Sequence, residues 1–236
     1  MKILITNDDG LHCEGIEALI KLAQPLGELT VVAPMYEQSG KSHAIEIKKP
    51  FAVEKTLLDG GLTAYAIDST PADCVRFAIV ALGKQFDLVL SGINCGYNLG
   101  KDILYSGTVG AAFEAAAFGI KAAAISTYPG GTQIAADALP GIYEMFAERD
   151  LFRSADIYNI NIPENSKGVR FTKQGGPYYR DRFIDNGDGT YVQQGYCVHM
   201  DAGDLTLDTD AVVNGYISIS PLTTERTDLK AFEELI

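Results

Sequence analysis

The first 33 residues contain two short apolar segments separated by a helical pattern. Residues 2–6 and 29–33 are runs of apolar, often β-branched residues without helical periodicity, which is typical of buried strands. Between them, apolar residues recur at helical spacing from Ile16 to Ala23, and Pro25-Leu26-Gly27 then ends the helix. A strand, a helix and a second strand in this order predict parallel strands joined by a right-handed crossover.

The alternation of strands and helices continues further along the chain. Three more helices are predicted at residues 70–82, 108–118 and 133–149. Three more strands are predicted at residues 87–90, 122–127 and 158–162. Pro140 lies inside the last helix and is expected to break or kink it. Residues 1–165 are therefore expected to form an α/β domain with a doubly wound, mostly parallel sheet in a Rossmann-like arrangement of three layers.

The last third of the chain has a different pattern. Asn-Gly and Asp-Gly pairs between two β-prone runs predict a hairpin over residues 183–192. Residues 216–220 alternate like a half-buried strand, and residues 228–236 form a predicted terminal helix capped by Thr227. We therefore expect residues 166–236 to form a β-rich extension. Because an isolated hairpin is marginally stable in water, this extension should pack on the domain or on a second subunit.

Two adjacent carboxylates follow the first predicted strand, in Asn7-Asp8-Asp9-Gly10. Ligands in open α/β sheets collect at the carboxyl ends of strands, which is where this segment is placed. Mg²⁺ takes oxygen ligands, commonly one or two carboxylates together with waters and substrate oxygens. The same four residues also suit a tight turn, because Asn and Asp cap their own backbone and Gly accepts a positive φ. Taken alone, the segment is compatible with a turn and with a cation site formed by Asp8 and Asp9.

Further oxygen-rich loops are placed near the same edge of the sheet. They are residues 38–43, with Ser39, residues 91–100, with Asn94 and Asn98, and residues 105–110. Because the carboxyl ends of parallel strands share one edge, these loops should meet the Asp8–Asp9 segment. In the last loop, Ser106, Gly107 and Thr108 precede a helix and offer hydroxyls and free backbone amides to a phosphate. The same three residues suit a helix cap, and a cap and an anion site are compatible.

Charge and composition exclude several classes of function. The 236 residues include 19 Lys and Arg against 31 Asp and Glu, a formal net charge of −12, which argues against binding a nucleic-acid duplex. A small anionic substrate would have to be bound by a metal ion, helix N-termini and backbone amides. No segment approaches the length of a membrane span, and the N-terminal apolar run is too short for a secretory signal. We therefore expect a cytoplasmic protein that does not bind membranes.

Other common motifs are absent. The glycines of residues 92–100 do not fit the G-x-G-x-x-G fingerprint, and there is no P-loop, which weakens dehydrogenase and ATPase interpretations. The four cysteines are scattered without a C-x-x-C pair, so neither a zinc site nor a disulfide framework is indicated.

Taken together and in order, the motifs resemble those of the SurE survival-protein family. The resemblance rests on Asn7-Asp8-Asp9-Gly10, Ser39-Gly40, Thr70-Pro71-Ala72-Asp73-Cys74, Ser91-Gly92-Ile93-Asn94 with Gly96, Asn98 and Gly100, and Tyr105-Ser106-Gly107-Thr108-Val109. Weaker similarity continues at residues 159–163 and 208–222. Members of this family are metal-dependent nucleotidases of the bacterial and archaeal cytoplasm.

The resemblance implies roles for individual residues. One divalent cation, Mg²⁺ or Mn²⁺, would be held by Asp8, Asp9, Ser39 and Asn94. The phosphate of the substrate would be faced by Asn98, Ser106, Gly107 and Thr108, with Asn7 nearby. The family dimerises through its C-terminal extension, which implies a homodimer or homotetramer.

The implied reaction is hydrolysis of a nucleoside monophosphate by a metal-activated water, with Asp9 as the candidate proton acceptor. One alternative is a phosphatase that forms an aspartyl phosphate on Asp8, although such enzymes use Asp-x-Asp spacing rather than adjacent carboxylates. A second alternative is a nucleotide- or phosphate-binding module without catalysis. His43 is a further candidate for a contact to phosphate. The residues leave open the base, a 5′ or 3′ phosphate, and cleavage of short polyphosphate.

Overall fold

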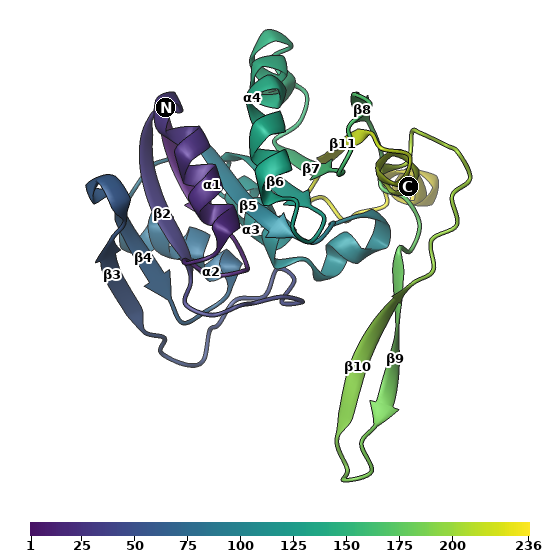
Figure 1. Cartoon of the computed structure of the whole chain (residues 1–236), viewed down its shortest axis with the longest axis horizontal. Coiled ribbons are helices and arrows are strands. Elements are labelled where there is room, and N and C mark those ends of the chain that lie inside the picture. Colours follow the sequence, from purple (N-terminus) through teal and green to yellow (C-terminus); the bar gives the residue numbers. More distant parts are fainter.

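A nine-stranded sheet organises the computed structural model, which describes residues 1–236 (Figure 1). The strand order across it is β3-β4-β2-β1-β5-β6-β7-β11-β8. In chain order these strands are β1 (Lys2–Thr6), β2 (Glu28–Pro34), β3 (Val53–Leu57), β4 (Thr63–Ile67), β5 (Leu88–Cys95), β6 (Lys121–Thr127), β7 (Ile157–Ile162), β8 (Val169–Phe171) and β11 (Ile217–Leu222). From β4 to β7 the neighbours are parallel, whereas β3 and β11 pair antiparallel with β4 and β7.

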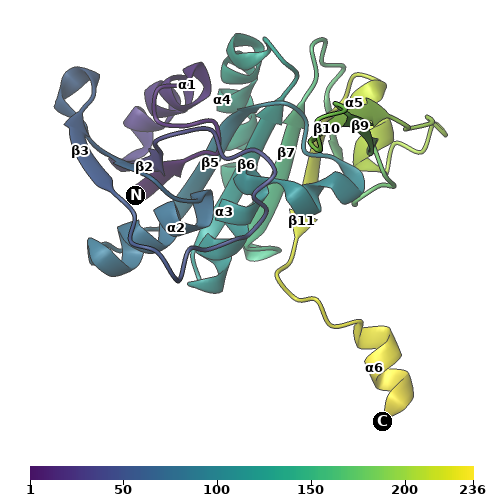
Figure 2. The same cartoon turned by 90° about the horizontal axis from the view of Figure 1, so that it is seen from below.

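Helices cover both faces of this sheet (Figures 1 and 2). They are α1 (Glu14–Ala23), α2 (Pro71–Arg76), α3 (Gly107–Ala117), α4 (Thr132–Glu148) and α5 (Asp208–Val213). The last helix, α6 (Leu229–Leu235), is exposed along its whole length. Side chains of α1 and α4 pack with Ile3 and Ile5 in one core cluster. Side chains of α2 and α3 pack with Leu4 in the other, because successive residues of a strand point to opposite faces. The predicted doubly wound fold with three layers is confirmed.

The structure contradicts two local predictions, a break of the helix at Pro140 and a cap at Thr227, whereas a kink at Pro140 stays a prediction. Pro140 does not break α4, which runs from Thr132 to Glu148 and places Leu139, Ile142 and Phe146 in the core. Burial of these side chains on both sides of the proline outweighs the hydrogen bond that proline cannot donate. Thr227 does not cap the last helix. Asp228 does so instead, because its Oδ1 accepts a hydrogen bond from Ala231 N at 3.0 Å.

The C-terminal part of the chain contains a separate two-stranded antiparallel sheet of β9 (Tyr179–Asp185) and β10 (Tyr191–Cys197), as the Asn-Gly and Asp-Gly pairs predict. This hairpin projects away from the main sheet in Figure 1 and α6 does so in Figure 2. β8 and β11 come from the same part of the chain and extend the main sheet. The division near residue 165 stays a prediction. None of the helices combines the length and apolar character that a membrane crossing requires.

Candidate active site

The segment after β1 forms a tight turn closed by Asn7. Its Nδ2 donates to Gly10 O at 2.9 Å and to Cys13 Sγ at 2.9 Å, and its Oδ1 accepts from Gly10 N at 3.2 Å. Gly10 has a φ of 103°, which L side chains rarely adopt. Asn7 is fully buried, so its amide contacts the turn rather than open space. The turn interpretation is thereby confirmed, and the turn fixes the two carboxylates that lie inside it.

Asp8 is buried against the start of α3. Its Oδ1 accepts a hydrogen bond from Thr108 Oγ1 at 2.5 Å, and only 4% of the residue is exposed. Burial raises the pKa of Asp8, although the hydrogen bond from Thr108 acts in the opposite direction. A Cβ added to Gly107 would lie 2.9 Å from Asp8 Cβ and 3.0 Å from Oδ2, so glycine is needed for this close approach. The carboxylate of Asp8 is therefore buried and closely packed, and a bound cation would stabilise its charged form.

Asp9 is half-buried beside Asp8, and its Oδ2 accepts a hydrogen bond from Cys95 N at 3.4 Å. Burial and then repulsion from Asp8 raise the pKa of Asp9 to about 6, and Glu37 adds to the repulsion. No Lys or Arg forms an ion pair with either carboxylate. Three acidic groups therefore converge without a positive partner, as expected of a site that holds a divalent cation.

The loop of Ser39 and the end of β5, which contains Asn94, flank these carboxylates. Gln38 N donates to Asp8 O at 2.7 Å, which brings the Ser39 loop against the turn, and the contact of Cys95 N with Asp9 does the same for the end of β5. Residues 91–95 were predicted to be loop and instead continue the strand. The side chains themselves have other partners. Ser39 Oγ donates to Glu37 at 2.7 Å, and Asn94 Nδ2 donates to Gly96 O at 2.7 Å, which leaves the Asn94 Oδ1 available as an oxygen ligand.

The start of α3 lies at the same edge of the sheet. Ser106 caps the helix, because its Oγ accepts a hydrogen bond from Val109 N at 3.1 Å. Gly107 and Thr108 occupy the first turn, where backbone amides lack partners within the helix and favour anions. The hydroxyl of Thr108 donates to Asp8, and the backbone amides of Thr108 and Gly107 also lower the pKa of that carboxyl, so a phosphate at this helix start would share these amides with Asp8.

Asn98 is held by a buried network that sequence reasoning missed. Its N donates to Asn161 Oδ1 at 2.9 Å, and its O accepts from Nδ2 of Asn159 at 2.8 Å and of Asn161 at 2.9 Å. Its own Nδ2 donates to Ser126 Oγ at 2.8 Å. A signal was present in the sequence, because two Asn at alternate positions of the apolar strand β7 point to the same face. Fully buried asparagines in such a strand need specific partners.

His43 lies on the flank of α3 rather than among the predicted phosphate contacts. Its Nε2 is 2.5 Å from Glu114 Oε2, and Arg76 donates to the other oxygen of Glu114 at 2.7 Å. Burial opposes ionisation of Glu114, but the hydrogen bonds from His43 and Arg76 hold its pKa below the ordinary value. This network ties the loop after Ser39 to α3, which is a structural use of the histidine.

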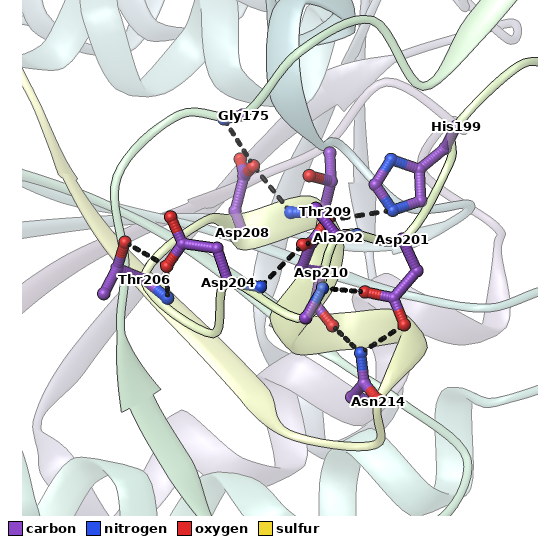
Figure 3. Close-up of polar contacts among 11 residues, drawn as sticks. Gly175, His199, Asp201, Ala202, Asp204, Thr206, Asp208, Thr209, Asp210 and Asn214 are labelled. Atoms are coloured by element: carbon purple, nitrogen blue, oxygen red, sulfur yellow. Dashed lines mark hydrogen bonds and ion pairs between the residues drawn. The ribbon is translucent and has the colours of Figure 1, made fainter.

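A second group of metal-ligating side chains was not predicted. His199, Asp201 and Asp210 each offer one ligand atom, and these atoms lie within 4.8 Å of one another (Figure 3). They come from the irregular segment after β10 and from the first turn of α5.

Comparison with known proteins identifies the family of this chain. Residues 3–181 match the family described as Survival protein SurE. This chain belongs to the SurE family. It is 39% identical over 249 aligned positions to the 5′-nucleotidase SurE of Syntrophomonas wolfei, with 99% of this chain and 93% of that protein covered. It is 41% identical over 256 positions to the 5′-nucleotidase SurE of Carboxydothermus hydrogenoformans, with 100% and 95% covered.

The fold agrees with that of a solved SurE protein. The crystal structure of the SurE protein from Aquifex aeolicus matches with a TM-score of 0.81 and 34% identity, covering 100% of this chain and 98% of that one. The family resemblance inferred from the motifs is therefore confirmed. The SurE match of residues 3–181 includes every site residue that the motifs predicted.

Proposed function

We propose that this chain is a metal-dependent 5′-nucleotidase that hydrolyses nucleoside monophosphates to nucleoside and phosphate. The observation that supports this most directly is the buried Asp8 beside Asp9 at the start of α3, with the pKa of both carboxyls raised and no positive side chain to neutralise them. Relatives that match over nearly their whole length bear the name 5′-nucleotidase.

One divalent cation, Mg²⁺ or Mn²⁺, would be held by oxygen atoms of Asp8, Asp9, Ser39 and Asn94. This set fits the cation, because it combines carboxylate, hydroxyl and amide oxygens and because the site is strongly acidic. When bound, the cation would neutralise phosphate oxygens and lower the pKa of the attacking water. It would also restore the pKa of Asp8 and Asp9 to lower values, since an opposite charge nearby favours the ionised carboxylate.

The remaining groups position the phosphate and move a proton. The first-turn amides of α3, from Gly107 and Thr108, would bind phosphate oxygens, with Ser106 fixing the start of the helix. Asn98 would contact the phosphate from a backbone held by Asn159 and Asn161. Asn7 would act through the turn that it closes. Asp9, the more accessible of the two carboxylates, would accept the proton of the attacking water.

Phosphate release from a panel of substrates tests the proposal. The panel contains nucleoside 5′-monophosphates, 3′-monophosphates and short polyphosphate, each with Mg²⁺, with Mn²⁺ and with chelator. We expect release from the 5′-monophosphates that chelator abolishes. Binding of a nucleotide without release in either metal would instead identify a binding module.

An aspartyl phosphate on Asp8 is the rival mechanism. The low exposure of Asp8 and its hydrogen bond to Thr108 favour a ligand over a nucleophile. The stereochemical course at phosphorus, followed with a substrate whose phosphate is chiral through oxygen isotopes and sulfur, separates the two. Inversion supports one direct attack by water, whereas retention shows two displacements and therefore a phosphoenzyme on Asp8.

We also propose that the hairpin of β9 and β10 contributes to a homodimer or homotetramer. Every residue of both strands is exposed, including the apolar Phe183 and Tyr191 at 68% and 61%. A two-stranded hairpin with apolar side chains in water lacks the packing that it needs for stability. Sedimentation of the full chain gives the number of subunits.

A further inference from the structure

The side chains of His199, Asp201 and Asp210 converge outside the candidate active site (Figure 3). Asp210 is 1% exposed, and its Oδ2 accepts hydrogen bonds from Ala202 N at 3.1 Å and Asp204 N at 2.9 Å. Its other oxygen, Oδ1, lies 3.1 Å from Nε2 of His199. The backbone thus orients this carboxylate and leaves one of its oxygens directed at the imidazole.

The imidazole nitrogen has no hydrogen-bond partner. The side chain of His199 is only 10% exposed, and Nε2 itself is buried without a hydrogen bond, because its approach to Asp210 does not have hydrogen-bonding geometry. The ring is fixed by Tyr178, which stacks on it at 5.4 Å between centroids and 17° between planes. A buried polar atom without a partner is rare in folded proteins. A nitrogen fixed in this way and directed at two carboxylates is a ligand to which a cation could bind.

Asp201 completes the group from the solvent side. Its Oδ1 accepts from Gly203 N at 2.8 Å and its Oδ2 from Asn214 Nδ2 at 2.8 Å, so the carboxylate is oriented while each oxygen keeps a free lone pair. Such outer contacts are typical of carboxylates that bind metals. No Lys or Arg forms an ion pair with Asp201 or Asp210. The two neighbouring carboxylates therefore have only the imidazole of His199 beside them.

We propose that His199, Asp201 and Asp210 bind a transition-metal ion, Mn²⁺ or Zn²⁺, at a site separate from the catalytic cation. An imidazole nitrogen with two carboxylates favours these ions over Mg²⁺, which prefers oxygen ligands alone. The site goes beyond the proposed nucleotidase activity and does not depend on it.

The ion would fasten residues 199–204 to α5, and α5 in turn supports the active-site loop. Asp208 of α5 accepts hydrogen bonds from Gly100 N at 2.9 Å and from Gly175 N at 2.7 Å. Gly100 ends the loop that follows β5 and contains Asn98. The proposed ion therefore stabilises the segment that returns from the hairpin and, through α5, the position of that loop.

Counting bound Mn²⁺ on the full chain tests this site. Metal-free protein is titrated with Mn²⁺, and free Mn²⁺ is measured by electron paramagnetic resonance. We expect two ions per wild-type chain, and one per chain for Asp201→Asn and for His199→Gln. Asp204→Asn is the matched control, since Asp204 is an exposed acid of the same segment that bonds to Thr206, and it should keep both ions.

Competition and the catalytic variant separate the two sites. Excess Mg²⁺ should displace Mn²⁺ from the site of Asp8 and leave the ion at His199 in place. Asp8→Asn should also bind one ion, which Mg²⁺ does not displace. If Asp8→Asn keeps both ions while Asp201→Asn loses one, the proposed catalytic cation is wrong and the His199 site stands.

The opposite result overturns the inference. If Asp201→Asn and His199→Gln bind as many ions as Asp204→Asn, with unchanged affinity, the three side chains form only an ion-paired cluster. A rise in thermal midpoint with Mn²⁺ in the presence of excess Mg²⁺ gives a second readout. That rise should be present in Asp204→Asn and absent from Asp201→Asn, because binding to the folded state alone raises stability.

Discussion

The active-site edge and the hairpin of β9 and β10 are built in opposite ways. At the active-site edge, polar side chains are buried and most have specific partners, as Asn7, Thr108 and Asn161 show with no exposed surface. In the hairpin every residue is exposed, and apolar side chains such as Phe183 and Tyr191 face solvent. The active-site edge is thus a buried polar site on the main sheet, and the hairpin is an exposed surface with apolar side chains that lies away from that sheet.

The difference shows which contacts fix the conformation of each region. The polar groups at the edge are fixed by strands β1, β5 and β7, so their geometry exists before any ligand arrives. The hairpin has its own ladder of hydrogen bonds and a contact at its base, where Tyr179 N donates to Asp102 Oδ2 at 2.8 Å. It needs a second surface to bury its apolar side chains. Substitutions at the edge should therefore change chemistry within one chain, whereas substitutions in the hairpin should change association.

Asp8→Asn should have the largest effect. We expect phosphate release to fall by about 10³-fold or more, because the neutral amide is a far weaker ligand for a divalent cation. The metal-free variant should be as stable as the wild type or more stable, since the buried negative charge is gone and the hydrogen bond from Thr108 is retained. Activity assays and thermal unfolding in chelator measure the two effects. Full activity in the purified variant would remove Asp8 from the mechanism.

Asn161→Ala should have the next largest effect. The change leaves the buried Asn98 N without an acceptor, which costs about 1–3 kcal/mol of stability. We expect kcat to fall by roughly 10- to 100-fold, because the loop that faces the phosphate loses its alignment. The number of bound metal ions should not change. Asn165→Ala, an exposed asparagine just beyond the same strand, is the control and should retain normal kcat and stability.

Much of the active-site edge could be predicted from the sequence, because its signals are local. Strand periodicity followed by Asn7-Asp8-Asp9-Gly10 placed two carboxylates at a strand end, and the cap at Ser106 marked the start of α3. The shared edge of the parallel strands grouped the loops, and the family resemblance then implied roles for their residues. The partner of His43 could not be found in this way, because Glu114 is 71 residues away and only the packing of α3 brings them together.

The His199 cluster shows a second limit. Its members are separated by an irregular segment with neither strand nor helix periodicity, so no pattern predicts that Asp210 turns back toward His199. The same reasoning applies to Asp208, whose contact with Gly100 spans 108 residues. Side chains that hold loops together through backbone amides leave little trace in the local sequence, whereas strand ends and caps do.

The pH dependence of stability should reveal the crowded carboxylates. The pKa of Asp9 is raised from 3.8 to about 6 in the folded chain, so the folded state holds this proton more tightly than the unfolded state. Stabilisation by protonation is therefore fully present below pH 3.8 and is lost as the pH rises through about 6. Thermal unfolding in chelator should show a midpoint that falls over this range relative to Asp9→Asn. A constant difference between the two proteins would contradict the raised pKa.

Phe183→Ser should have the smallest effect on a single chain and yet change association. The side chain is 68% exposed, so the free energy of unfolding of the protomer should change by less than about 0.5 kcal/mol. If the hairpin lies in a subunit interface, sedimentation should show a shift toward monomer. The variant loses an apolar contact there and buries a hydroxyl without a hydrogen-bond partner, which costs free energy of association. Val80→Ser is the matched control, since Val80 is 65% exposed on the segment after α2. Equal association of both variants would place the interface elsewhere and leave the exposed hairpin without a partner.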